Sequence, residues 1–483
     1  MATSQIQNCS GLYINGEWVD SQHKMGVFDK FNETLIAEVA IASQNDVDRA
    51  VQAANDAMSS RPLAAHERYE ILKKTAELVE RHKQEIAELI AREGGKPLKE
   101  ASGEVNRAIQ TITISAEEAK RIHGETIPLD AAPGSENRMG LYIRVPVGVV
   151  AAITPFNFPL NLVVHKVAPA IAAGCAVVLK PASTTPLTAI YLCKLLEEAG
   201  LPKGYINLVI GSGRTVGDYL VEHPGKKLVS FTGSPSVGLR IKERSGLNRV
   251  ILELGNNSGN IVHHDANLDL AADLLAKRAF SSAGQFCVSV QRIYVHEGVM
   301  DSFSRKMIEA TNKLKVGNPL DPETDVGPMI SLEEAKRVET WIQEAVAGGA
   351  EVLTGGSRDG VVVQPTLLKN VTAEMKVVCE EVFGPVASII PYQTFEQAID
   401  LVNDSEYGLQ AGVFTSNIDL AWKAARKIRA GGVIINDTSS YRADHMPYGG
   451  VDKSGSGREG PRFAVEEMSE IRMIVFNVQD NGA

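Results

Sequence analysis

Cys287 is the residue whose setting in this sequence most directly suggests chemistry. It lies in the stretch 281–292, behind a Gly-Gln pair and ahead of a short β-prone run. A thiol on a tight turn before a strand is accessible and not packed in the core, and an accessible thiol can act as a nucleophile. The alternative is an inert core cysteine, because free cysteines are among the most buried side chains.

Two further polar residues follow apolar strands. Asn157 lies in the Pro- and Phe-rich loop 154–159, and Lys180 ends a second apolar run. The Asn157 amide could stabilise a developing oxyanion, or merely cap the following segment. Lys180 could reach a ribose hydroxyl or a phosphate, although an exposed lysine is the commoner outcome. Both lie where α/β folds bind ligands, at the carboxyl ends of parallel strands.

Glu253 ends a strand that is otherwise Val-Ile-Leu. Apolar surroundings disfavour the charged carboxylate, so we expect the pKa of Glu253 to lie above its usual range. A carboxylate of this kind suits a general base near neutral pH. A partnered structural glutamate is the alternative.

Two stretches could hold a dinucleotide. In 231–238 a strand ends in Thr-Gly, Ser234 suits a helix N-cap and Pro235 suits the first helical position. A helix N-terminus after a glycine turn can bind a pyrophosphate, although this is not the six-residue glycine fingerprint. The turn at 211–213 is a second, equally weak signal. In 380–385, Glu381 and Phe383 could hold a sugar and a flat ring, or the two acids could form a solvated face.

The hydrophobic pattern predicts the elements that must position these residues. The first quarter is mainly helical, and a polar Pro- and Gly-rich ribbon follows it at 125–140. From residue 148, apolar strands alternate with amphipathic helices, which favours a parallel sheet covered on both faces. The predicted strands are 12–19, 141–150, 148–154, 176–180, 206–210, 227–232 and 250–254, and the helices 45–58, 65–93, 98–119, 185–200, 216–223 and 235–244.

The alternation restarts after residue 260 as a second α/β block. It contains a strand at 292–296 and helices at 268–281, 299–314, 333–347, 395–404 and 420–429. A last strand, 473–478, has no obvious partner in its own neighbourhood.

Composition excludes several classes of partner. The 483 residues are 44% hydrophobic and 22% charged, as in ordinary globular proteins, and the net charge of −10 argues against nucleic acid and anionic membranes. The first eleven residues are polar, unlike a signal peptide, and no apolar run is long enough to span a bilayer. The cysteines are few and scattered, which indicates a reducing, cytoplasmic setting without disulfides or a thiolate metal site; they are Cys9, Cys175, Cys193, Cys287 and Cys379.

Taken together, the order and spacing of these motifs resemble the NAD(P)-dependent aldehyde dehydrogenase superfamily over nearly the whole chain. The resemblance is carried by Ile-Asn-Gly (14–16), Thr-Pro-Phe-Asn-Phe-Pro (154–159), Lys-Pro-Ala (180–182), Phe-Thr-Gly-Ser (231–234), Glu-Leu-Gly (253–255), Gly-Gln-x-Cys (284–287), Glu-Glu-x-Phe-Gly-Pro (380–385), Pro-Tyr-Gly-Gly (447–450) and Ser-Gly-Ser-Gly-Arg-Glu (454–459). The stretch 442–448 also looks like the lactaldehyde- or glyceraldehyde-oxidising branches and semialdehyde-type members.

The resemblance implies an α/β subunit of three parts. These are a Rossmann-like cofactor domain (1–122 and 144–255), an α/β catalytic domain (256–470) and a small β oligomerisation flap (123–143 and 471–483). Such flaps pair across subunits, which implies a homodimer or homotetramer. The cofactor would be NAD or NADP, the partner a small aldehyde, and no metal is implied.

The resemblance also implies residue roles. Cys287 would be the nucleophile, Glu253 the general base, and the Asn157 amide with the Cys287 backbone N–H the oxyanion hole; Lys180 joins this catalytic set. The implied cofactor-binding residues are Ile153, Thr154, Pro155, Phe156, Lys180, Ser183, Gly213, Phe231, Gly233, Ser234, Val237, Leu254, Glu381 and Phe383. The implied substrate-binding residues are Phe158, His165, Phe286, Val288, Arg442 and Tyr448.

Three departures from the family pattern bear on function. Asn256 stands where a glycine is common and could alter the route of the attacking water. Ser183 stands where NAD-preferring members often carry Glu, so with Lys180 and Arg214 nearby NADP is admissible. Arg442 and His165 fall at pocket positions that are often aromatic, and two cationic groups would suit an anionic or hydroxylated aldehyde such as a lactaldehyde-like, sulfo- or phospho-substituted aldehyde or succinate semialdehyde. The alternative is that Arg442 pairs with Asp444 or another acid and never meets substrate.

Two other functions remain open at this point. Acyl transfer to coenzyme A would replace hydrolysis, but relatives of that kind generally lack the base glutamate that Glu253 matches. A non-catalytic binding protein on the same fold is the other, and the presence of Cys287, Glu253 and Asn157 argues against it.

Overall fold

The computed structural model describes residues 11–478. The predictions that concern the polar N-terminal residues 1–10, Cys9 among them, and the last five residues of the flap lie outside the described part. No helix within the described residues is long and apolar enough to cross a membrane.

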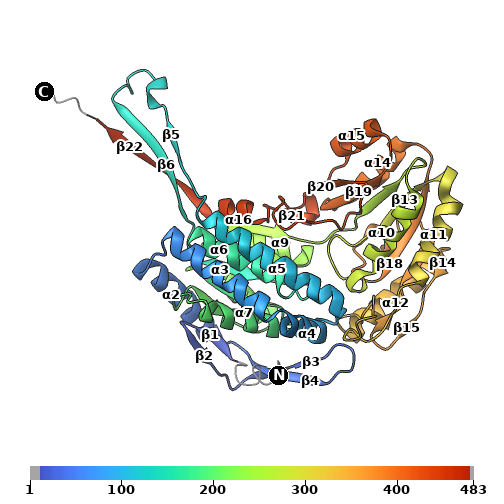
Figure 1. Ribbon diagram of the computed structural model, residues 1–483, viewed down its shortest axis with the longest axis horizontal. Helices are drawn as coiled ribbons and strands as arrows, with labels where there is room; N and C mark the ends of the chain where they lie inside the picture. Colours follow the sequence, from blue (N-terminus) through green and yellow to red (C-terminus); the bar gives the residue numbers. More distant parts are fainter. Residues whose placement is uncertain (1–10, 479–483) are drawn as a thin grey trace.

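An eight-stranded sheet forms the first α/β unit (Figure 1). Its five central strands are parallel, so their carboxyl ends share one edge. In order across the sheet the strands are β2 (Glu17–Val19), β1 (Leu12–Ile14), β9 (Ile206–Leu208), β8 (Val177–Lys180), β7 (Val150–Ile153), β10 (Leu228–Thr232), β11 (Arg249–Glu253) and β21 (Gly455–Ser456).

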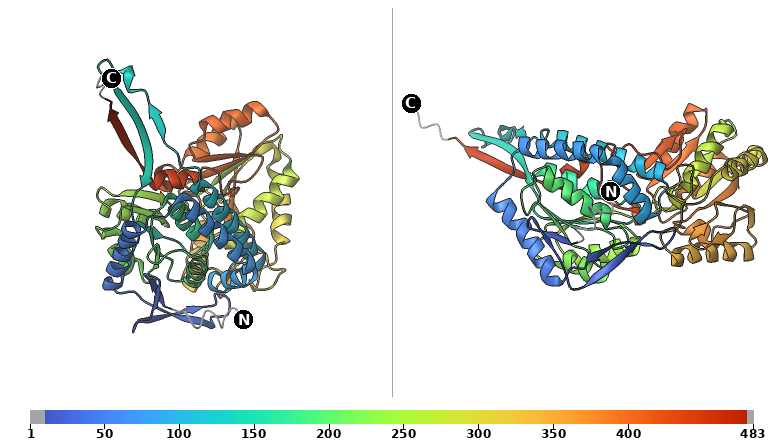
Figure 2. Two further views of the ribbon diagram at one scale, coloured as in Figure 1. Left: turned by 60° about the vertical axis from the view of Figure 1, so that its left-hand side comes forward. Right: turned by 60° about the horizontal axis from the view of Figure 1, so that its bottom comes forward.

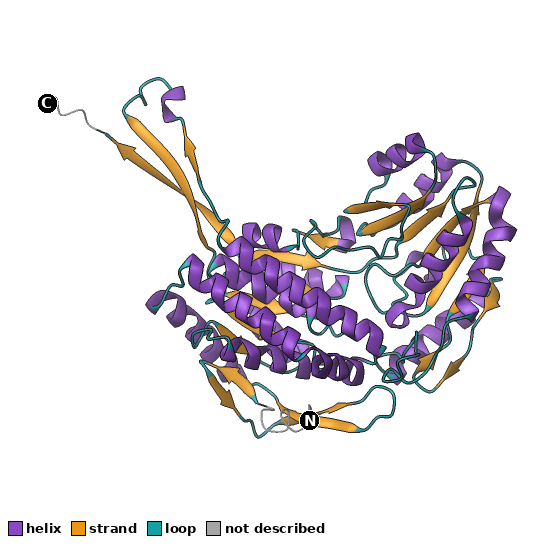
Figure 3. Ribbon diagram, viewed as in Figure 1, coloured by secondary structure: helices purple, strands orange, loops and turns teal. Residues whose placement is uncertain are grey.

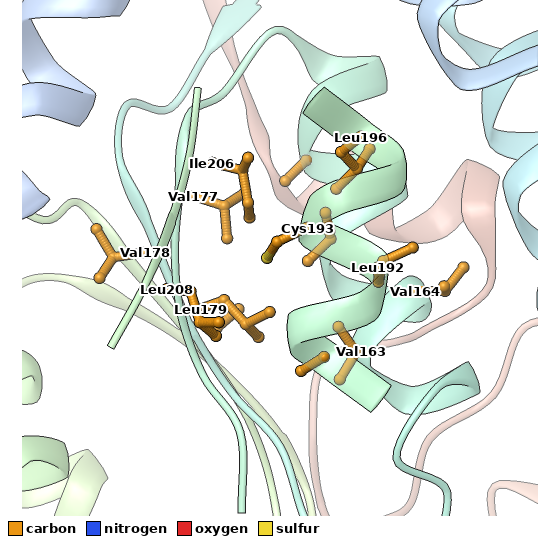
Figure 4. Packing of buried hydrophobic residues seen from close by; sticks show 14 of the residues in the cluster. Val163, Val164, Val177, Val178, Leu179, Leu192, Cys193, Leu196, Ile206 and Leu208 are labelled. Carbon is orange, nitrogen blue, oxygen red and sulfur yellow. The ribbon is translucent and has the colours of Figure 1, made fainter. Parts of the chain in front are cut away.

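Helices cover this sheet in layers. α6 (Asn161–Ala173) and α7 (Leu187–Glu198) contact the central strands, and α3 (Ala65–Arg81), α4 (Lys83–Gly94) and α5 (Leu98–Ala119) pack over them. Figure 4 shows the apolar contacts beneath, where Cys193 of α7 points toward Val177 and Ile206 of the strands and Leu192 points toward Val164 of α6. The remaining helices are α2 (Gln44–Ser60), α8 (Asp218–Glu222), α9 (Pro235–Arg244) and α16 (Pro461–Glu467).

A seven-stranded sheet forms the second unit, which Figure 2 shows beside the first. Its strands are parallel except for the edge strand β14. The order is β14 (Glu351–Thr354), β17 (Thr366–Lys369), β18 (Val386–Tyr392), β13 (Arg292–His296), β12 (Gly259–Val262), β19 (Gln410–Phe414) and β20 (Gly432–Ile435). The helices α10 (Leu268–Phe280), α11 (Met300–Asn312), α12 (Leu332–Ala347), α14 (Phe395–Asn403) and α15 (Ile418–Lys427) accompany it.

A three-stranded antiparallel ribbon projects from the body, as the strands in Figure 3 show. It consists of β5 (Glu125–Ile127), β6 (Arg138–Pro146) and β22 (Ser469–Asn477). β22 pairs with β6 over nine residues, from Ser469 with Pro146 to Asn477 with Arg138. The C-terminal strand therefore finds its partner more than 300 residues away in the chain.

Three elements differ from the sequence-based expectation. Residues 12–19 are two strands and not one, because Asn15 and Gly16 both have positive φ (52° and 76°) and form a tight hairpin turn. The helix expected at 65–93 breaks at His82, whose backbone leaves helical geometry.

Residues 455–467, which were expected in the catalytic domain (256–470), contact the first α/β unit instead. β21 pairs with β11 of the first sheet, and α16 packs on α5 and α6 of the first unit. The chain thus returns to the first unit before entering the ribbon. The other predicted domain boundaries stay a prediction.

Candidate active site

A cavity of about 790 Å³ is lined by residues of both α/β units. It opens at the carboxyl edge of β7, β10 and β11 and reaches the loop before β13. The expected site residues that line it are Pro155, Phe156, Asn157, Phe158, Gly233, Ser234, Leu254, Phe286, Cys287, Val288, Glu381, Phe383, Arg442 and Tyr448.

Cys287 follows an unusual backbone turn, η3 (Ser281–Gly284). Ser282 and Ala283 have φ of 48° and 54°, a left-handed conformation that costs about 1–2 kcal/mol per non-glycine residue. Gly284 is also left-handed, and a Cβ there would lie 2.1 Å from the Gly384 carbonyl oxygen, so only glycine fits. The turn delivers the Cys287 side chain, half-buried, to the cavity.

Within residues 11–478 the Cys287 sulfur has one hydrogen-bonding neighbour, the Tyr448 hydroxyl at 3.1 Å. Burial raises the pKa of the Cys287 thiol to about 12, and the Tyr448 hydrogen bond opposes this rise. The thiol of this protein without ligands is therefore held protonated, and thiolate formation depends on the charges and donors around it.

Asn157 lies beside this turn at the start of the loop into α6. Its Nδ2 donates to the Gln285 carbonyl oxygen at 2.9 Å, which fixes the amide two residues from Cys287. Gln285 is itself anchored, because its Oε1 accepts from the Ile330 backbone N–H at 2.8 Å. The second Nδ2 hydrogen of Asn157 has no acceptor among the described residues and can point into the cavity.

Glu253 ends β11 and is 3% exposed. Neither carboxylate oxygen has a hydrogen-bond partner among the described residues. Burial raises the pKa of Glu253 well above its usual range, and the neighbouring Glu459 raises it further. A Cβ on Gly449 would lie 3.0 Å from Glu253 Oε1, so this carboxyl packs against the residue after Tyr448. Glu253 does not line the main cavity, but a buried, unpaired carboxyl with a raised pKa fits a general base near neutral pH.

The residues expected to hold a dinucleotide lie along the carboxyl ends of β7, β8 and β10. Thr154 and Thr232 follow or end two of these strands, and their hydroxyls are buried without partners among the described residues. Ser234 and Pro235 begin α9 as expected, and Gly233 and Ser234 line the cavity. No side chain caps this helix, so its first N–H groups keep no side-chain partner. Orphaned donors at a strand edge beside a helix N-terminus fit a bound dinucleotide.

Lys180 is buried at the end of β8, where burial lowers the pKa of its ammonium to about 8. Its Nζ donates to the Pro181 carbonyl oxygen at 3.0 Å. Ser183 donates to the Gly211 carbonyl oxygen at 2.7 Å, and Arg214 is exposed in the π-helical turn Gly213–Gly217 (η2) beyond it. The expected cofactor residues that do not line the main cavity are Ile153, Thr154, Lys180, Ser183, Gly213, Phe231 and Val237.

The adjacent acids Glu380 and Glu381 lie in different environments. Glu380 is exposed, whereas Glu381 lines the cavity and accepts from the Asn256 backbone N–H at 2.8 Å. Burial raises the pKa of Glu381 to about 7. Phe383 meets Phe156 edge-to-face across the cavity, with ring centroids 5.9 Å apart. The Asn256 side chain turns toward Ser258 and does not line the main cavity.

His165 corrects one expectation, because it does not line the cavity. It is 1% exposed within α6, and its Nε2 lies 2.9 Å from Asp444 Oδ1. Burial and the neighbouring Arg442 lower the pKa of His165, so the imidazole is neutral and no cation. Its packing on one face of a wholly buried helix explains the error, since sequence alone could not tell which face meets the cavity.

Arg442 does line the cavity, and it also pairs with an acid. Its Nη2 lies 3.1 Å from Glu459 Oε2, and its guanidinium stacks 3.6 Å from the centre of the Tyr448 ring. The alternative expectation named Asp444 or another acid as the partner of Arg442; the acid is Glu459, and Asp444 binds Arg107 at 2.8 Å. The Arg442 Nε is buried without a partner among the described residues.

The sequence did not lead us to expect that α5 forms one wall of the cavity. Glu100, Gly103, Glu104 and Arg107 line the cavity. Their spacing of three and four residues places them on one face of the helix, and this polar stripe was the signal available in the sequence. Lys96, Lys99, Arg278 and Glu334 complete the polar rim. Within residues 11–478 no group of His, Cys, Asp or Glu is arranged to hold a metal ion.

Comparison with known proteins agrees with this geometry. Residues 18–474 match the aldehyde dehydrogenase family. A 3-sulfolactaldehyde dehydrogenase from Priestia aryabhattai is 54% identical over 97% of this chain and 98% of its own. Aldehyde dehydrogenase 21 from Physcomitrella patens, solved in complex with the reaction product succinate, is 39% identical with a TM-score of 0.94 over 96% of this chain and 98% of its own.

A third similar protein was solved with a dinucleotide. Glyceraldehyde-3-phosphate dehydrogenase from Methanocaldococcus jannaschii, complexed with NADP, is 40% identical with a TM-score of 0.91 over 95% of this chain and 100% of its own. The expected fold class and family are confirmed. The chain belongs to the aldehyde dehydrogenase family and is an NAD(P)-dependent oxidoreductase that acts on aldehydes.

Proposed function

We propose that this enzyme oxidises a short aldehyde bearing an anionic or hydroxylated tail to the carboxylic acid. The observation that carries the proposal is the shared cavity. It joins the Cys287 sulfur to the turn before α9 on one side and to Arg442 on the other. A nucleophile, a dinucleotide site and an anion-binding cation thus meet in one space.

The residues that would hold the dinucleotide are those at the strand edge. Gly233 and Ser234 at the α9 N-terminus would bind the pyrophosphate, Lys180 the ribose, and Glu381 with Phe383 the nicotinamide riboside. When bound, NAD(P) accepts the hydride that the aldehyde carbon releases. The orphaned hydroxyls of Thr154 and Thr232 support this placement.

Cys287 and Asn157 would carry the first half of the reaction. The Cys287 thiolate attacks the carbonyl carbon and forms the C–S bond, while the carbonyl oxygen becomes an alkoxide. The free Asn157 Nδ2 hydrogen and the Cys287 backbone N–H stabilise that oxygen. Loss of hydride from the same carbon restores the carbonyl and leaves a thioester on Cys287.

Glu253 would carry the second half. It takes a proton from a water molecule whose oxygen attacks the thioester carbon, and the C–S bond breaks. The products are the carboxylic acid and free Cys287. Coenzyme A could replace water in an acyl-transfer enzyme, but the buried, unpaired carboxyl of Glu253 supports hydrolysis. A non-catalytic binding protein would have no need of such a group.

Arg442 supports a substrate whose tail carries an anionic or hydroxyl group. Its unpartnered Nε and its place on the cavity wall suit a sulfonate, carboxylate, phosphate or hydroxyl on the aldehyde tail. The relatives named for sulfolactaldehyde and glyceraldehyde 3-phosphate, and the one solved with succinate, support an anionic tail. Sulfolactaldehyde is the first substrate to test.

The proposal also covers the coenzyme, the oligomeric state and the cellular compartment. The short Ser183 side chain and the exposed Arg214 support the use of NADP as well as NAD, because no carboxylate there would repel a 2′-phosphate. We also propose a homodimer or homotetramer of three-part subunits in the cytoplasm. The exposed apolar ribbon supports the assembly, and the free described cysteines support a reducing setting.

An aldehyde panel with two variants tests the proposal. Sulfo-, phospho-, carboxy- and unsubstituted short aldehydes are mixed with NAD or NADP, with and without coenzyme A, and reduced nicotinamide is followed. Cys287→Ser should abolish turnover. Arg442→Ala should lower kcat/KM for the anionic aldehydes by roughly ten- to a hundredfold, the value of a hydrogen bond to a charged group, and spare neutral ones. Equal effects on both classes would remove Arg442 from the substrate site.

A further inference from the structure

We propose that the Tyr448 hydroxyl is the hydrogen-bond donor that stabilises the Cys287 thiolate, and that the stacked Arg442 strengthens this donor. The proposal rests on the proposed role of Cys287 as nucleophile. It assigns Tyr448 a task distinct from lining the substrate pocket. The contact that carries it is the 3.1 Å approach of the hydroxyl to the sulfur.

The backbone of Tyr448 is fixed by a short antiparallel bridge. Its N–H donates to the Glu459 carbonyl oxygen at 3.1 Å, and the Glu459 N–H donates back at 2.7 Å. The Glu459 carboxylate in turn binds Lys166 at 2.9 Å and Arg442 at 3.1 Å. Tyr448, Glu459 and Arg442 therefore form one rigid unit.

The Tyr448 ring is fixed as well. It is 4% exposed and packs with Phe286, Val288 and Leu409 in a small apolar cluster that Cys287 also contacts. The ring therefore cannot swing away from the sulfur without leaving this packing. Arg442 lies over the same ring at 3.6 Å. A cation on the ring face stabilises negative charge on the phenol, so the O–H becomes a stronger donor.

Four neighbouring side chains shift the pKa of the Cys287 thiol, and they shift it in opposite directions. Burial is the main cause of the high pKa of the Cys287 thiol, and the carboxyls of Glu381 and Glu253 add to it. Tyr448 and Arg442 act against these effects, with the Tyr448 hydrogen bond as the largest opposing contribution. In a buried site that otherwise disfavours thiolate, one donor hydroxyl matters more than it would in water.

Tyr448→Phe removes only the hydroxyl and keeps the ring under Arg442. We expect the apparent pKa of Cys287 to rise by about one unit, because a hydrogen bond to a charged group has roughly that value. Below this pKa the rate of Cys287 alkylation by iodoacetamide follows the thiolate fraction, so the rate measured without aldehyde at one pH should fall about tenfold. Mass spectrometry of the Cys287 peptide separates it from the exposed Cys379.

Tyr441→Phe is the matched control, since it makes the same change on the same loop. The Tyr441 side chain is 50% exposed and does not line the cavity, so its alkylation profile should match that of the wild type. In the Tyr448→Phe enzyme, kcat/KM should fall by the same factor, about tenfold below the thiol pKa, for anionic and neutral aldehydes.

An unchanged or lowered Cys287 pKa in Tyr448→Phe would overturn the proposal. A loss confined to one aldehyde class would also overturn it, because Tyr448 would then contact substrate and not the thiolate. If Tyr448→Phe folds poorly, replacement of tyrosine by 3-fluorotyrosine gives a second measurement. The more acidic phenol should lower the Cys287 pKa, and no change would refute the idea. Full activity of Cys287→Ser would instead defeat the proposed function itself.

Discussion

At the scale of single residues, Glu253 is the most unusual group of the site. It is a buried carboxyl with both oxygens unpartnered among the described residues. Buried polar atoms are almost always hydrogen-bonded, so a buried carboxyl without partners lowers the stability of the fold and indicates a functional role. Its raised pKa keeps it protonated at acid pH, where it cannot take a proton from water.

This predicts the pH dependence of hydrolysis. Because burial favours the protonated form, the base form of Glu253 is populated only as pH rises through the raised pKa. The rate of thioester hydrolysis should therefore fall on the acid side at a pH well above the ordinary glutamate range. Pre-steady-state kinetics across pH separates this step from hydride transfer.

Glu253→Gln should preserve the shape of the site and remove the base. We expect turnover to fall by roughly 10²- to 10⁴-fold. Reduced nicotinamide should appear as a burst of one equivalent per active site and then stall, because the thioester accumulates. Added hydroxylamine should restore turnover by attacking the thioester directly. Steady turnover without a burst would show that another group activates water.

At the scale of elements, α5 connects the first α/β unit to the turn that carries Cys287. Glu100 accepts hydrogen bonds from the Ser281 hydroxyl (2.6 Å), the Ser282 N–H (2.9 Å) and the Ser282 hydroxyl (2.7 Å). These bonds hold Ser282 in its left-handed conformation. A strained backbone persists only when its surroundings over-determine it.

Glu100→Ala should therefore relax the turn and misplace Cys287. Loss of three hydrogen bonds costs about 1 kcal/mol each, part of which appears as a lower melting temperature. We expect kcat to fall about tenfold or more, since small misplacements of a nucleophile are costly. The dissociation constant of NAD(P) should change little, because the Glu100 carboxylate binds Ser281 and Ser282 and not the α9 turn.

Glu117→Ala on the same helix is the control. Glu117 pairs with Arg121 on the surface, and exposed pairs of this kind contribute little. Its melting temperature and kcat should match those of the wild type. Equal behaviour of the two variants would contradict a positioning role for Glu100.

At the scale of the whole molecule, the ribbon is the part that cannot be stable alone. Its three strands expose apolar side chains on both faces: Ile143, Met473 and Val475 are 38%, 43% and 50% exposed, and Phe476 is 52% exposed. An isolated small sheet gains too little burial in water, and exposed apolar patches of this kind mark interfaces. The ribbon is thus the surface on which the proposed assembly depends.

Charges placed on the ribbon should disrupt that assembly. Met473 and Val475 lie two residues apart on β22 and so share one face. The double change Met473→Lys and Val475→Lys should give monomers in light scattering, because burying two unpaired ammonium groups is strongly unfavourable. Asn477→Lys places one charge at the last residue of β22, where a polar side chain already stands, and should stay assembled. A wild-type monomer would refute the proposed oligomer.

Much of the architecture was predictable because it follows from local periodicity. The apolar runs ending at Lys180, Thr232 and Glu253 are strands β8, β10 and β11, as expected. In the second unit, β12, β14, β17, β18, β19 and β20 were not predicted. Periodicity alone cannot tell a short apolar run in a strand from one in a buried helix, and the pairing with strands distant in sequence decides it. The return of β21 to the first sheet has the same cause.

The sequence by itself determined which residues could do chemistry. Parallel strands bring their carboxyl ends to one edge, so Asn157 and Glu253 had to approach each other once the strands were known. Only the tertiary structure decided the partners of the charged groups behind the cavity. His165 and Asp444 are 279 residues apart and Lys166 and Glu459 are 293 apart, so no local pattern could pair them. Desolvation and pairing energies depend on such three-dimensional neighbours. These neighbours separate Arg442, which lines the cavity, from His165, which does not.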